Sequence, residues 1–527
     1  MKSGFKLMLE KPILLLLAVN LIAGLFIFDN YGLSWDEPLF YDYGNALGYA
    51  YSPPEWLSGQ FDVDNSYGSS GDDHKTRGPA YLLLARGPVR LLEIFGVESA
   101  SAWHLINFLF FQVGVYFFYR LSLRWMKPSA ALAAAALFAW QPMLWGHAFI
   151  NPKDPPFMTF FLAAVCLGFE MVDRVTEPGG KNPLKIILPA ILLGITTSIR
   201  VLGPLAGVLV FIYFLYAVFT SRNLRVPVSP WLLFFGYGFI TLLSMFLTWP
   251  YLWEEPLSRF LEVFRLMSDN PTSLSVLFGG EVFRAGDLPR RYLPFMLAVT
   301  LTEPIWILFA LGVIAGYWKL LRDRSPARAR NLVTVTLVLL WFVIVVAYVF
   351  IRQPAMYDGI RHFLFILPPI FLFTGFVFEF LMERSYNWLY AGILAAILLP
   401  GLYSIIQLHP YEYTYYNSLV GGTQNAFRRY ETDYWLTCYK EAVEELNHSI
   451  TEPVTLFVHR EAYIAQYYAS PHIAVRELRG AVSEVQPGDY VLVNSRTNED
   501  RRVFQDAPHV IEIRHGGALF CTIKRIP

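Results

Sequence analysis

Two neighbouring carboxylates, Asp36 and Glu37, follow the first long apolar segment of the chain, residues 13–28. Ionised groups beside hydrocarbon are costly unless water, a partner or a reaction makes use of their charge. A loop that simply begins in water is the alternative interpretation of this pair. The functional interpretation is that these carboxylates take part in general acid–base chemistry at a membrane surface.

A third carboxylate, Asp154, lies in the short sequence Asn151-Pro-Lys-Asp-Pro-Pro between two apolar segments. Prolines here end one helix and suit the first turn of the next. On a purely structural interpretation, Asp154 caps the following helix and Lys153 is an ordinary interfacial lysine. The other interpretation adds both side chains to the charges gathered at one membrane surface.

Further cations stand in similar places. Arg200 lies between two apolar segments with almost no loop, and Arg361 opens another apolar segment. Arg200 alternatively extends to lipid headgroups, and Arg361 either binds a phosphate or pairs with Asp358. Lys75 and Arg77 lie in the polar stretch that follows the first apolar segment.

Acids and guanidinium groups at one membrane surface suit the transfer of a group from a lipid-linked phosphate. A carboxylate removes the proton of the acceptor hydroxyl, and cations stabilise the departing phosphate. Arginine fits the second task because its planar fork matches phosphate oxygens.

The composition indicates that the chain positions these groups in a bilayer. Of the 527 residues, 55% are hydrophobic and only 16% are charged, which is too apolar for an ordinary soluble protein. The formal net charge is +0, so no basic excess points to a nucleic-acid partner. We therefore expect a mainly α, polytopic membrane protein in contact with membrane lipids.

Apolar windows of helix length predict about eleven transmembrane segments. They are 12–29, 101–123, 129–150, 157–173, 184–199, 201–220, 230–249, 303–320, 332–351, 361–381 and 388–407. These segments make residues 1–407 one transmembrane domain, with a long outer loop at 30–100. Within that loop, residues 81–95 mix leucines with two arginines, which favours an interfacial helix, and residues 292–302 are expected to lie in the interface too.

Basic residues give the predicted orientation, because short cytoplasmic loops are rich in Lys and Arg. With Lys2, Lys6 and Lys11 before a retained anchor, the N-terminus is predicted to be cytoplasmic. Every loop then predicted inside is basic: Arg120, Arg124, Lys127, Arg174, Lys181, Lys185, Arg222, Arg225, Lys319, Arg322, Arg324, Arg328, Arg330 and Arg384. The odd number of segments leaves the C-terminus outside.

Residues 408–527 are expected to form a small extracytoplasmic α/β domain, because apolar runs shorten and charges return. Strands are predicted at 454–459, 490–494 and 518–524, beside a helix at 440–447. Cys438 and Cys521 lie in this region and can pair if it is extracytoplasmic. The aromatic stretch 409–435 either stacks on a sugar or forms an interfacial belt.

The candidate residues resemble a known family, the GT-C membrane glycosyltransferases with a polyprenyl-phosphate sugar as donor. This type includes protein O-mannosyltransferases and the lipid A aminoarabinose transferase. The resemblance rests on Trp35-Asp36-Glu37, on Thr76-Arg77-Gly-Pro79-Ala-Tyr81 and on Lys153-Asp154-Pro155. The order of spans and outer loops over residues 1–407 is similar as well.

The resemblance implies a GT-C fold, an inverting transfer and Asp36 as the general base. Asp154 is similar to the family's second essential carboxylate, and Glu37 joins this catalytic group as the residue that orients the loop or the acceptor. No metal or cofactor is expected, since zinc spacings and Gly-rich nucleotide loops are absent. Asp72-Asp73-His74, the one cluster suited to a divalent cation, is interpreted as a solvated loop.

For the donor phosphate, the resemblance points first to Arg77. The aminoarabinose enzymes have a lysine after a glutamate at this position, whereas this chain has a threonine before Arg77, so Lys75 is a second candidate. Lys153, Arg200 and Arg361 join the predicted phosphate site because the topology places them on the same face.

The sequence therefore predicts an integral-membrane glycosyltransferase of a bacterial inner or plasma membrane, acting at the extracytoplasmic face. Its partners would be a polyprenyl-phosphate sugar, hexosyl or pentosyl, and a protein, lipid or glycan acceptor. The alternative is a transporter or flippase of a lipid-linked saccharide. Transporters usually hold substrate charges near the bilayer midplane and have repeated halves, whereas these charges lie at span ends and no repeat is visible.

Overall fold

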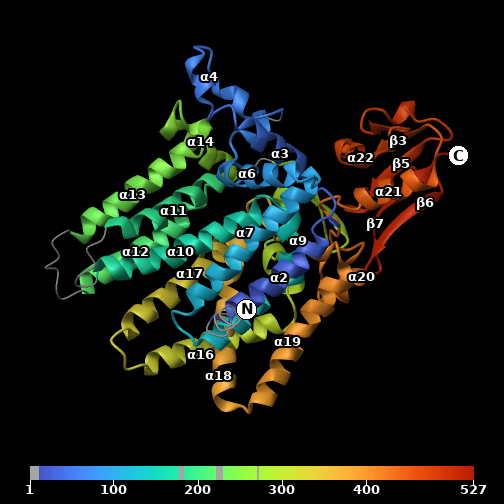
Figure 1. Cartoon of the computed structure of the whole chain (residues 1–527). Coiled ribbons are helices and arrows are strands. Elements are labelled where there is room, and N and C mark those ends of the chain that lie inside the picture. Colours follow the sequence, from blue (N-terminus) through green and yellow to red (C-terminus); the bar gives the residue numbers. More distant parts are fainter. Residues whose placement is uncertain (1–10, 70, 177–182, 221–228, 270–271) are drawn as a thin grey trace.

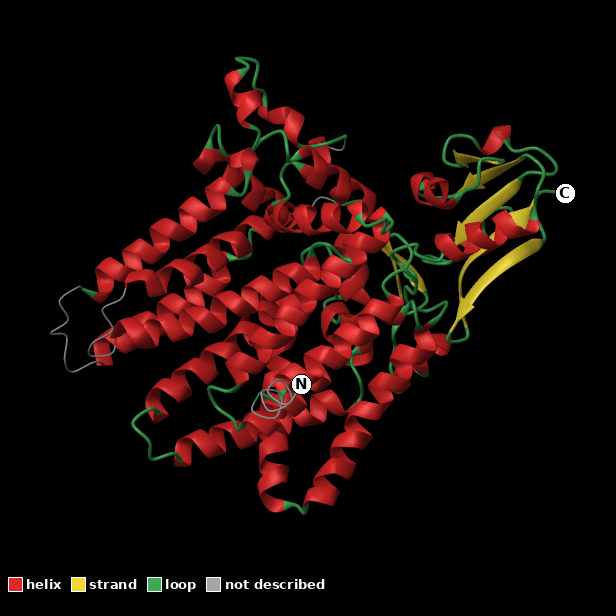
Figure 2. Ribbon diagram, in the orientation of Figure 1, coloured by secondary structure: helices red, strands yellow, loops and turns green. Residues whose placement is uncertain are grey.

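Apolar helices make up the body of the molecule and run side by side, and a small β-sheet lies at one end (Figure 1). Figure 2 shows the same division, with red helices in the body and yellow strands almost confined to the C-terminal part. The computed structural model describes residues 11–69, 71–176, 183–220, 229–269 and 272–527. Lys2, Lys6, Lys181, Arg222 and Arg225, which contributed to the predicted orientation, lie outside these ranges.

In the first part of the chain, one apolar helix precedes several short polar ones, and a run of consecutive apolar helices follows. Their bounds are α2 Ile13–Ile27, α3 Glu37–Ala46, α4 Pro53–Leu57, α5 Gly71–His74, α6 Ala80–Ile94, α7 Ser99–Ser122, α8 Pro128–Ala139, α9 Pro142–Ile150, α10 Asp154–Thr176, α11 Ile187–Ile199, α12 Pro204–Thr220, α13 Pro230–Leu247 and α14 Pro256–Asp269. A hairpin of β1 Ser275–Phe278 and β2 Glu281–Arg284 follows.

The remaining helices are α15 Tyr292–Thr300, α16 Pro304–Arg322, α17 Arg328–Arg352, α18 Leu367–Arg384, α19 Asn387–Leu408, α20 Gly422–Ala426, α21 Tyr439–Ser449 and α22 Ala462–Tyr468. Among the described residues, seven helices are long and apolar enough to cross a membrane, and four shorter apolar helices accompany them. Each predicted segment overlaps one of these helices. The chain is thus an integral membrane protein with a mainly helical fold.

One predicted segment is wrong as a single helix: residues 129–150 form α8 and α9, with a break at Trp140 and Gln141. Pro142 causes the break, because proline lacks the N–H that would continue the helix and its ring clashes with the preceding turn. At the break, the side-chain amide of Gln141 donates a 2.7 Å hydrogen bond to the hydroxyl of Thr302 and accepts the backbone N–H of that residue at 3.2 Å.

Two long helices form the centre of the bundle. In α10, 94% of the most apolar stretch is buried, and in the stretch 361–384, which contains α18, 89% is buried, whereas in α19 only 11% is. Phe365, in the 3₁₀ turn Arg361–Ile366 ahead of α18, packs on Phe157 and Phe161 of α10 at ring distances of 5.2 and 5.3 Å. Both central helices therefore begin at the same end of the bundle, which we call the sheet end.

The C-terminal sheet has the strand order β4-β3-β5-β7-β6. The strands are β3 Val454–Val458, β4 Ile473–Glu477, β5 Tyr490–Asn494, β6 His509–His515 and β7 Ala518–Arg525. Strand β3 pairs in parallel with β4 and β5, and β7 pairs antiparallel with β5 and β6. The predicted strands correspond to β3, β5 and β7, and the predicted helix to α21; β4 and β6 were not predicted.

A disulfide joins Cys438, just before α21, to Cys521 in β7, with their Cα atoms 6.2 Å apart. This is the pairing that the sequence suggested. The segment between α19 and α21 packs on the bundle: the amide of Asn417 donates 2.8 Å hydrogen bonds to the carbonyls of Ala298 and Leu301 at the end of α15. These bonds tie the segment that leads to the sheet to the end of α15.

Candidate functional site

Asp36 ends the loop that joins α2 to α3 and stands at the N-terminus of α3. Its side chain does not cap that helix and instead accepts a hydrogen bond from Arg361 Nη1 at 3.1 Å. Burial opposes ionisation of Asp36, but the positive charges of Arg361, Arg77 and His74 outweigh it, so the pKa of this carboxyl lies below its usual value. Asp36 is therefore an anion at neutral pH.

Asp154 is the first residue of α10 and is almost completely buried. Asn151, rather than Asp154, accepts the backbone N–H groups of Lys153 and Asp154, at 3.1 and 2.9 Å. The carboxylate of Asp154 contacts side chains: it accepts the amide of Asn151 at 2.9 Å and forms an ion pair with Arg200. The capping interpretation of Asp154 therefore does not describe its contacts.

Arg361 connects the acidic residues of the site. Its guanidinium lies 3.1 Å from Asp36, 2.9 Å from Asp358 and 3.9 Å from Asp154, measured between the nearest nitrogen and oxygen atoms. It also lies over the ring of Trp435, with 4.3 Å between Cζ and the ring centroid. A buried arginine surrounded by three carboxylates and an aromatic face is held in one orientation.

Arg200 follows the last residue of α11 and pairs with Asp154. Burial, together with repulsion from Arg361, lowers the pKa of Arg200 to about 9, so the group stays protonated at neutral pH. The four residues Asp36, Asp154, Arg200 and Arg361 thus form one continuous network, which we call the acid–arginine cluster.

Two more predicted cations gather around one aromatic ring beside this cluster. The ring of Phe40 in α3 lies 5.3 Å from Lys153 Nζ and 5.8 Å from Arg77 Cζ. Burial and repulsion by Arg77 and Arg200 lower the pKa of Lys153 well below its usual value. Positive charge is therefore crowded here, and a bound anion would relieve the repulsion.

Glu37 forms its hydrogen bonds and its ion pair with residues outside the acid–arginine cluster. It is fully buried and accepts the backbone N–H of Ser34 at 2.6 Å and the hydroxyl of Tyr41, and it lies 3.1 Å from Nε2 of His104 in α7. These contacts anchor the loop before α3 to α7. Glu37 accordingly has the geometry of a residue that orients the loop.

Lys75 follows α5, and its backbone carbonyl accepts the indole N–H of Trp249 at 3.4 Å. The side chains of Asp72 and Asp73 lie outside the described part of the structure. In the part that is described, no group of three or more His, Cys, Asp or Glu side chains is arranged to hold a metal ion.

No protein-family model matches the chain, and no curated protein matches it. Thirteen chains of solved structures are similar to it, among them the following two. The arabinofuranosyltransferase AftD from Mycobacteria is 15% identical over 97% of this chain, with a TM-score of 0.45, and the oligosaccharyltransferase of Archaeoglobus fulgidus is 11% identical over 84%, with a TM-score of 0.41. This chain spans 40% of the length of the first and 58% of the second.

Several residues of the site carried little signal in the sequence. Asn151 is visible as part of a short turn, but the capping alternative named Asp154 rather than Asn151. Trp435 was noted only as one of many aromatic residues. Arg496 was not singled out, although it is buried and lies 2.6 Å from Asp358 and 2.9 Å from Glu431. Its partners lie far from it in the sequence, so no local pattern indicates these contacts.

Proposed function

We propose that this chain is an integral-membrane glycosyltransferase of the GT-C type that transfers a sugar from a polyprenyl phosphate to a hydroxyl group. The observation that carries the proposal is the acid–arginine cluster: the half-buried Asp36 and the buried Asp154 share Arg361 at the sheet end of the bundle, beside the crowded cations Arg77 and Lys153. A base and a set of phosphate ligands are the two devices that this transfer needs.

In the proposed reaction, Asp36 takes the proton of the acceptor hydroxyl. The hydroxyl oxygen then attacks the anomeric carbon from the side opposite the phosphate. The bond between that carbon and the phosphate oxygen breaks, and polyprenyl phosphate leaves with the electron pair. A single displacement of this kind inverts the anomeric configuration.

The cations would act on the phosphate in both the ground state and the transition state. Arg361, Arg200 and Arg77 offer planar donors, and Lys153 offers a point charge. A phosphate that takes hydrogen bonds from Arg361 competes with Asp36 for the same donors. Donor binding would therefore weaken the 3.1 Å contact between Arg361 and Asp36 and make Asp36 a stronger base.

The location of the site supports a lipid-linked donor. The first residue of α10 and the turn before α18 meet where apolar helices end, so a phosphate bound there leaves its polyprenyl chain beside the bundle. The Cys438–Cys521 disulfide supports an extracytoplasmic position of the sheet, because disulfides persist in oxidising compartments. We extend this to a cytoplasmic N-terminus in a bacterial inner or plasma membrane, with residues 1–407 as the transferase domain and residues 408–527 as a second domain. We also propose that the enzyme is of the protein O-mannosyltransferase or aminoarabinose transferase type.

The test is a transfer assay on the purified protein. Radiolabelled polyprenyl-phosphate sugars, hexosyl and pentosyl, are incubated with protein, lipid and glycan acceptors, and wild type is compared with Asp36→Asn. We expect transfer by wild type and a loss of at least about 100-fold in the variant, because a missing general base costs roughly 10²–10⁴ in rate. Asp64→Asn, at an exposed position of the same outer segment, is the matched control and should behave as wild type.

Equal transfer by wild type and Asp36→Asn would remove Asp36 from the mechanism. If the labelled lipid moves from one leaflet of proteoliposomes to the other and no sugar is transferred, the protein is a transporter of a lipid-linked saccharide and the proposed enzyme activity is wrong.

A further inference from the structure

The loop that carries Asp36 is held mainly by residues from the C-terminal part of the chain. The backbone N–H of Leu33 donates to the hydroxyl of Tyr468 at 2.9 Å, and the hydroxyl of Tyr463 donates to the carbonyl of Trp35 at 2.5 Å. The N–H of Trp35 in turn donates to the carbonyl of Trp435 at 3.2 Å. In Figure 1, α22, which contains both tyrosines, lies on the side of the sheet that faces α3.

A second link runs through charged side chains and ends at Arg361. Arg496 follows β5 and is 1% exposed; its Nη2 donates to Asp358 at 2.6 Å and its Nε donates to Glu431 at 2.9 Å. Asp358 also lies 2.9 Å from Nη2 of Arg361, whose Nη1 bonds Asp36. An unbroken path of ion pairs therefore joins the sheet to the proposed base.

Arg496 touches the Asp36 loop as well. Its guanidinium lies over the ring of Trp35, the residue before Asp36, with 5.0 Å between Cζ and the ring centroid. The buried side chain of Arg496, in the turn after β5, thus contacts both the carboxylate of Asp358, which orients Arg361, and the loop that carries Asp36.

The electrostatics of this path depend on Arg496. Burial raises the pKa of Glu431 to about 7, although Arg496 lowers it, and burial also raises the pKa of Asp358 against the opposing effect of Arg496. Without the arginine, both carboxyls would be pushed further toward the neutral form. A neutral Asp358 would lose its ion pair with Arg361, and that guanidinium would lose one of the three carboxylates that orient it.

We propose that Arg496 is a positioning residue of the transferase site, which fixes Arg361 through Asp358 and fixes the Asp36 loop through Trp35. This inference rests on the proposed function and adds to it that the C-terminal sheet is part of the working site. Arg496 acts through its neighbours and has no assigned contact with substrate.

Arg496→Gln and Arg496→Lys, in the full-length protein, test the proposal by two measurements. The first is the transfer assay, in which we expect Arg496→Gln to lower kcat/KM by about 100-fold, since small displacements of catalytic groups cost on this order. Arg496→Lys keeps the charge and should recover a substantial part of that loss. Arg476→Gln removes an arginine whose ion pair with Glu484 is exposed and serves as the matched control with wild-type activity.

The second measurement is amide hydrogen exchange without substrate. In Arg496→Gln, exchange should become faster in peptides covering 29–37 and 353–366, while the peptides of the five-stranded sheet stay as protected as in wild type. Arg476→Gln should leave both regions unchanged.

Wild-type activity or unchanged exchange of both loops in Arg496→Gln would overturn the proposal. Loss of protection throughout the sheet would also overturn it, since Arg496 would then be needed for the fold of the sheet rather than for positioning. If wild type transfers no sugar at all, the proposed function fails, yet the exchange measurement still decides whether Arg496 fixes the two loops.

Discussion

Arg361 is shared by Asp36, Asp358 and Asp154, and this sharing sets the protonation state of the proposed base. The negative charge of Asp36 is stabilised by several cations at once, of which Arg77 belongs to the outer polar segment and not to the ion-pair network itself. The basicity of Asp36 can therefore be altered from Arg77 without breaking the contact between Arg361 and Asp36.

Arg77→Gln should shift the acidic limb of the transfer rate to higher pH. A nearby cation favours the carboxylate form, so removing it raises the pKa of Asp36 and the base is protonated sooner as the pH falls. The profile of kcat/KM against pH measures the shift, and Arg77→Lys should keep the wild-type profile. Arg90→Gln, at an exposed position of α6, is the control. An unshifted limb in Arg77→Gln would show that Asp36 does not set it.

Asp154→Asn should destabilise the protein as well as abolish transfer. The substitution keeps the shape of the side chain but leaves Arg200, and in part Arg361, without a counter-charge in a buried place. Breaking a buried ion pair from one side costs about 3–5 kcal/mol. Thermal unfolding in detergent measures the loss, with the exposed Asp506→Asn as the control. A melting temperature equal to that of wild type would mean that Asp154 is hydrated and not buried.

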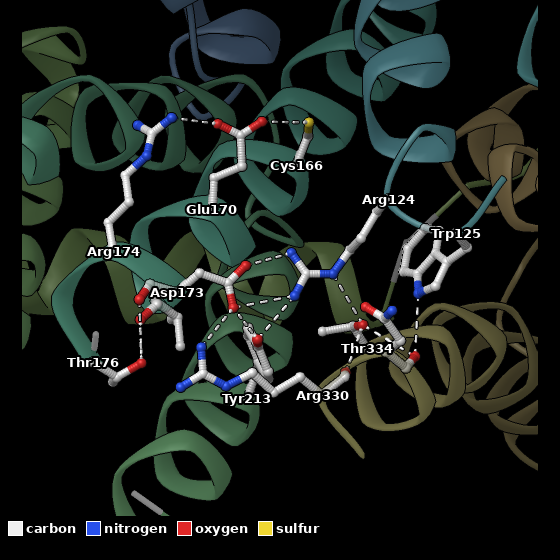
Figure 3. A network of polar contacts seen from close by, with 12 residues as sticks. Arg124, Trp125, Cys166, Glu170, Asp173, Arg174, Thr176, Tyr213, Arg330 and Thr334 are labelled. Carbon is white, nitrogen blue, oxygen red and sulfur yellow. Dashed lines mark hydrogen bonds and ion pairs between the residues drawn. The ribbon is translucent and has the colours of Figure 1, made fainter. Parts of the chain in front are cut away.

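At the scale of elements, α10 joins the site to a second polar network at its other end. There Arg124, two residues after the end of α7, makes a two-pronged ion pair with Asp173 of α10, at 2.6 and 3.2 Å. It also donates to Tyr213 of α12 and Thr334 of α17, as Figure 3 shows. This network fixes four helices against one another far from Asp154. We interpret it as a structural network that stabilises the packing of these helices, which we call the brace.

Asp173→Asn is therefore expected to lower stability without altering the chemistry at the site. Hydrogen bonds to charged groups contribute about 1.5–3 kcal/mol each, and the pair is only partly buried, so we expect a loss of about 1–3 kcal/mol. Thermal unfolding measures it, and the pH profile of transfer should stay as in wild type. Glu254→Gln breaks a more exposed pair with Arg259 and should cost at most about 1 kcal/mol. A displaced pH profile in Asp173→Asn would contradict the assignment as a brace.

The sequence predicted the elements better than their contacts. Helical spans and three strands follow from hydropathy and local patterns, which act over a few neighbouring residues. The signal for the break at Pro142 is equally local, but the continuous apolar run of residues 129–150 favoured a single helix in the prediction. The pair of Arg361 with Asp36 joins residues 325 positions apart, and that of Arg496 with Asp358 joins residues 138 apart. No local pattern carries such a pairing, so topology could place the charges on one face but could not select partners.

At the scale of the whole molecule, the sheet contributes contacts to the site of the bundle. The Cys438–Cys521 disulfide joins the segment just before α21 to strand β7 of this sheet. The bond closes a separation of 83 residues, for which a loop-entropy model gives about 4.5 kcal/mol. Residues next to the sheet hold the Asp36 loop, so we expect destabilisation of the sheet to displace Asp36 and lower the transfer rate.

We expect a reductant, or the double substitution Cys438→Ser/Cys521→Ser, to lower both the melting temperature and the transfer rate. Thermal unfolding and the transfer assay, each with and without reductant, measure the two effects. Cys166→Ala, which removes the buried free thiol in α10, should remain sensitive to reductant as wild type is. Full activity of the doubly substituted protein would show that the sheet holds the loop without help from the disulfide.

The contacts of the Asp36 loop also determine when, during translation, the site can assemble. Tyr463, Tyr468 and Arg496, which hold the Asp36 loop in place, leave the ribosome more than four hundred residues after Asp36. The nascent chain can insert its helices one after another and still contain no assembled site. On the proposed function, the site is complete only when the C-terminal strands pack against the Asp36 loop, so we expect chains truncated before Tyr463 to be inactive.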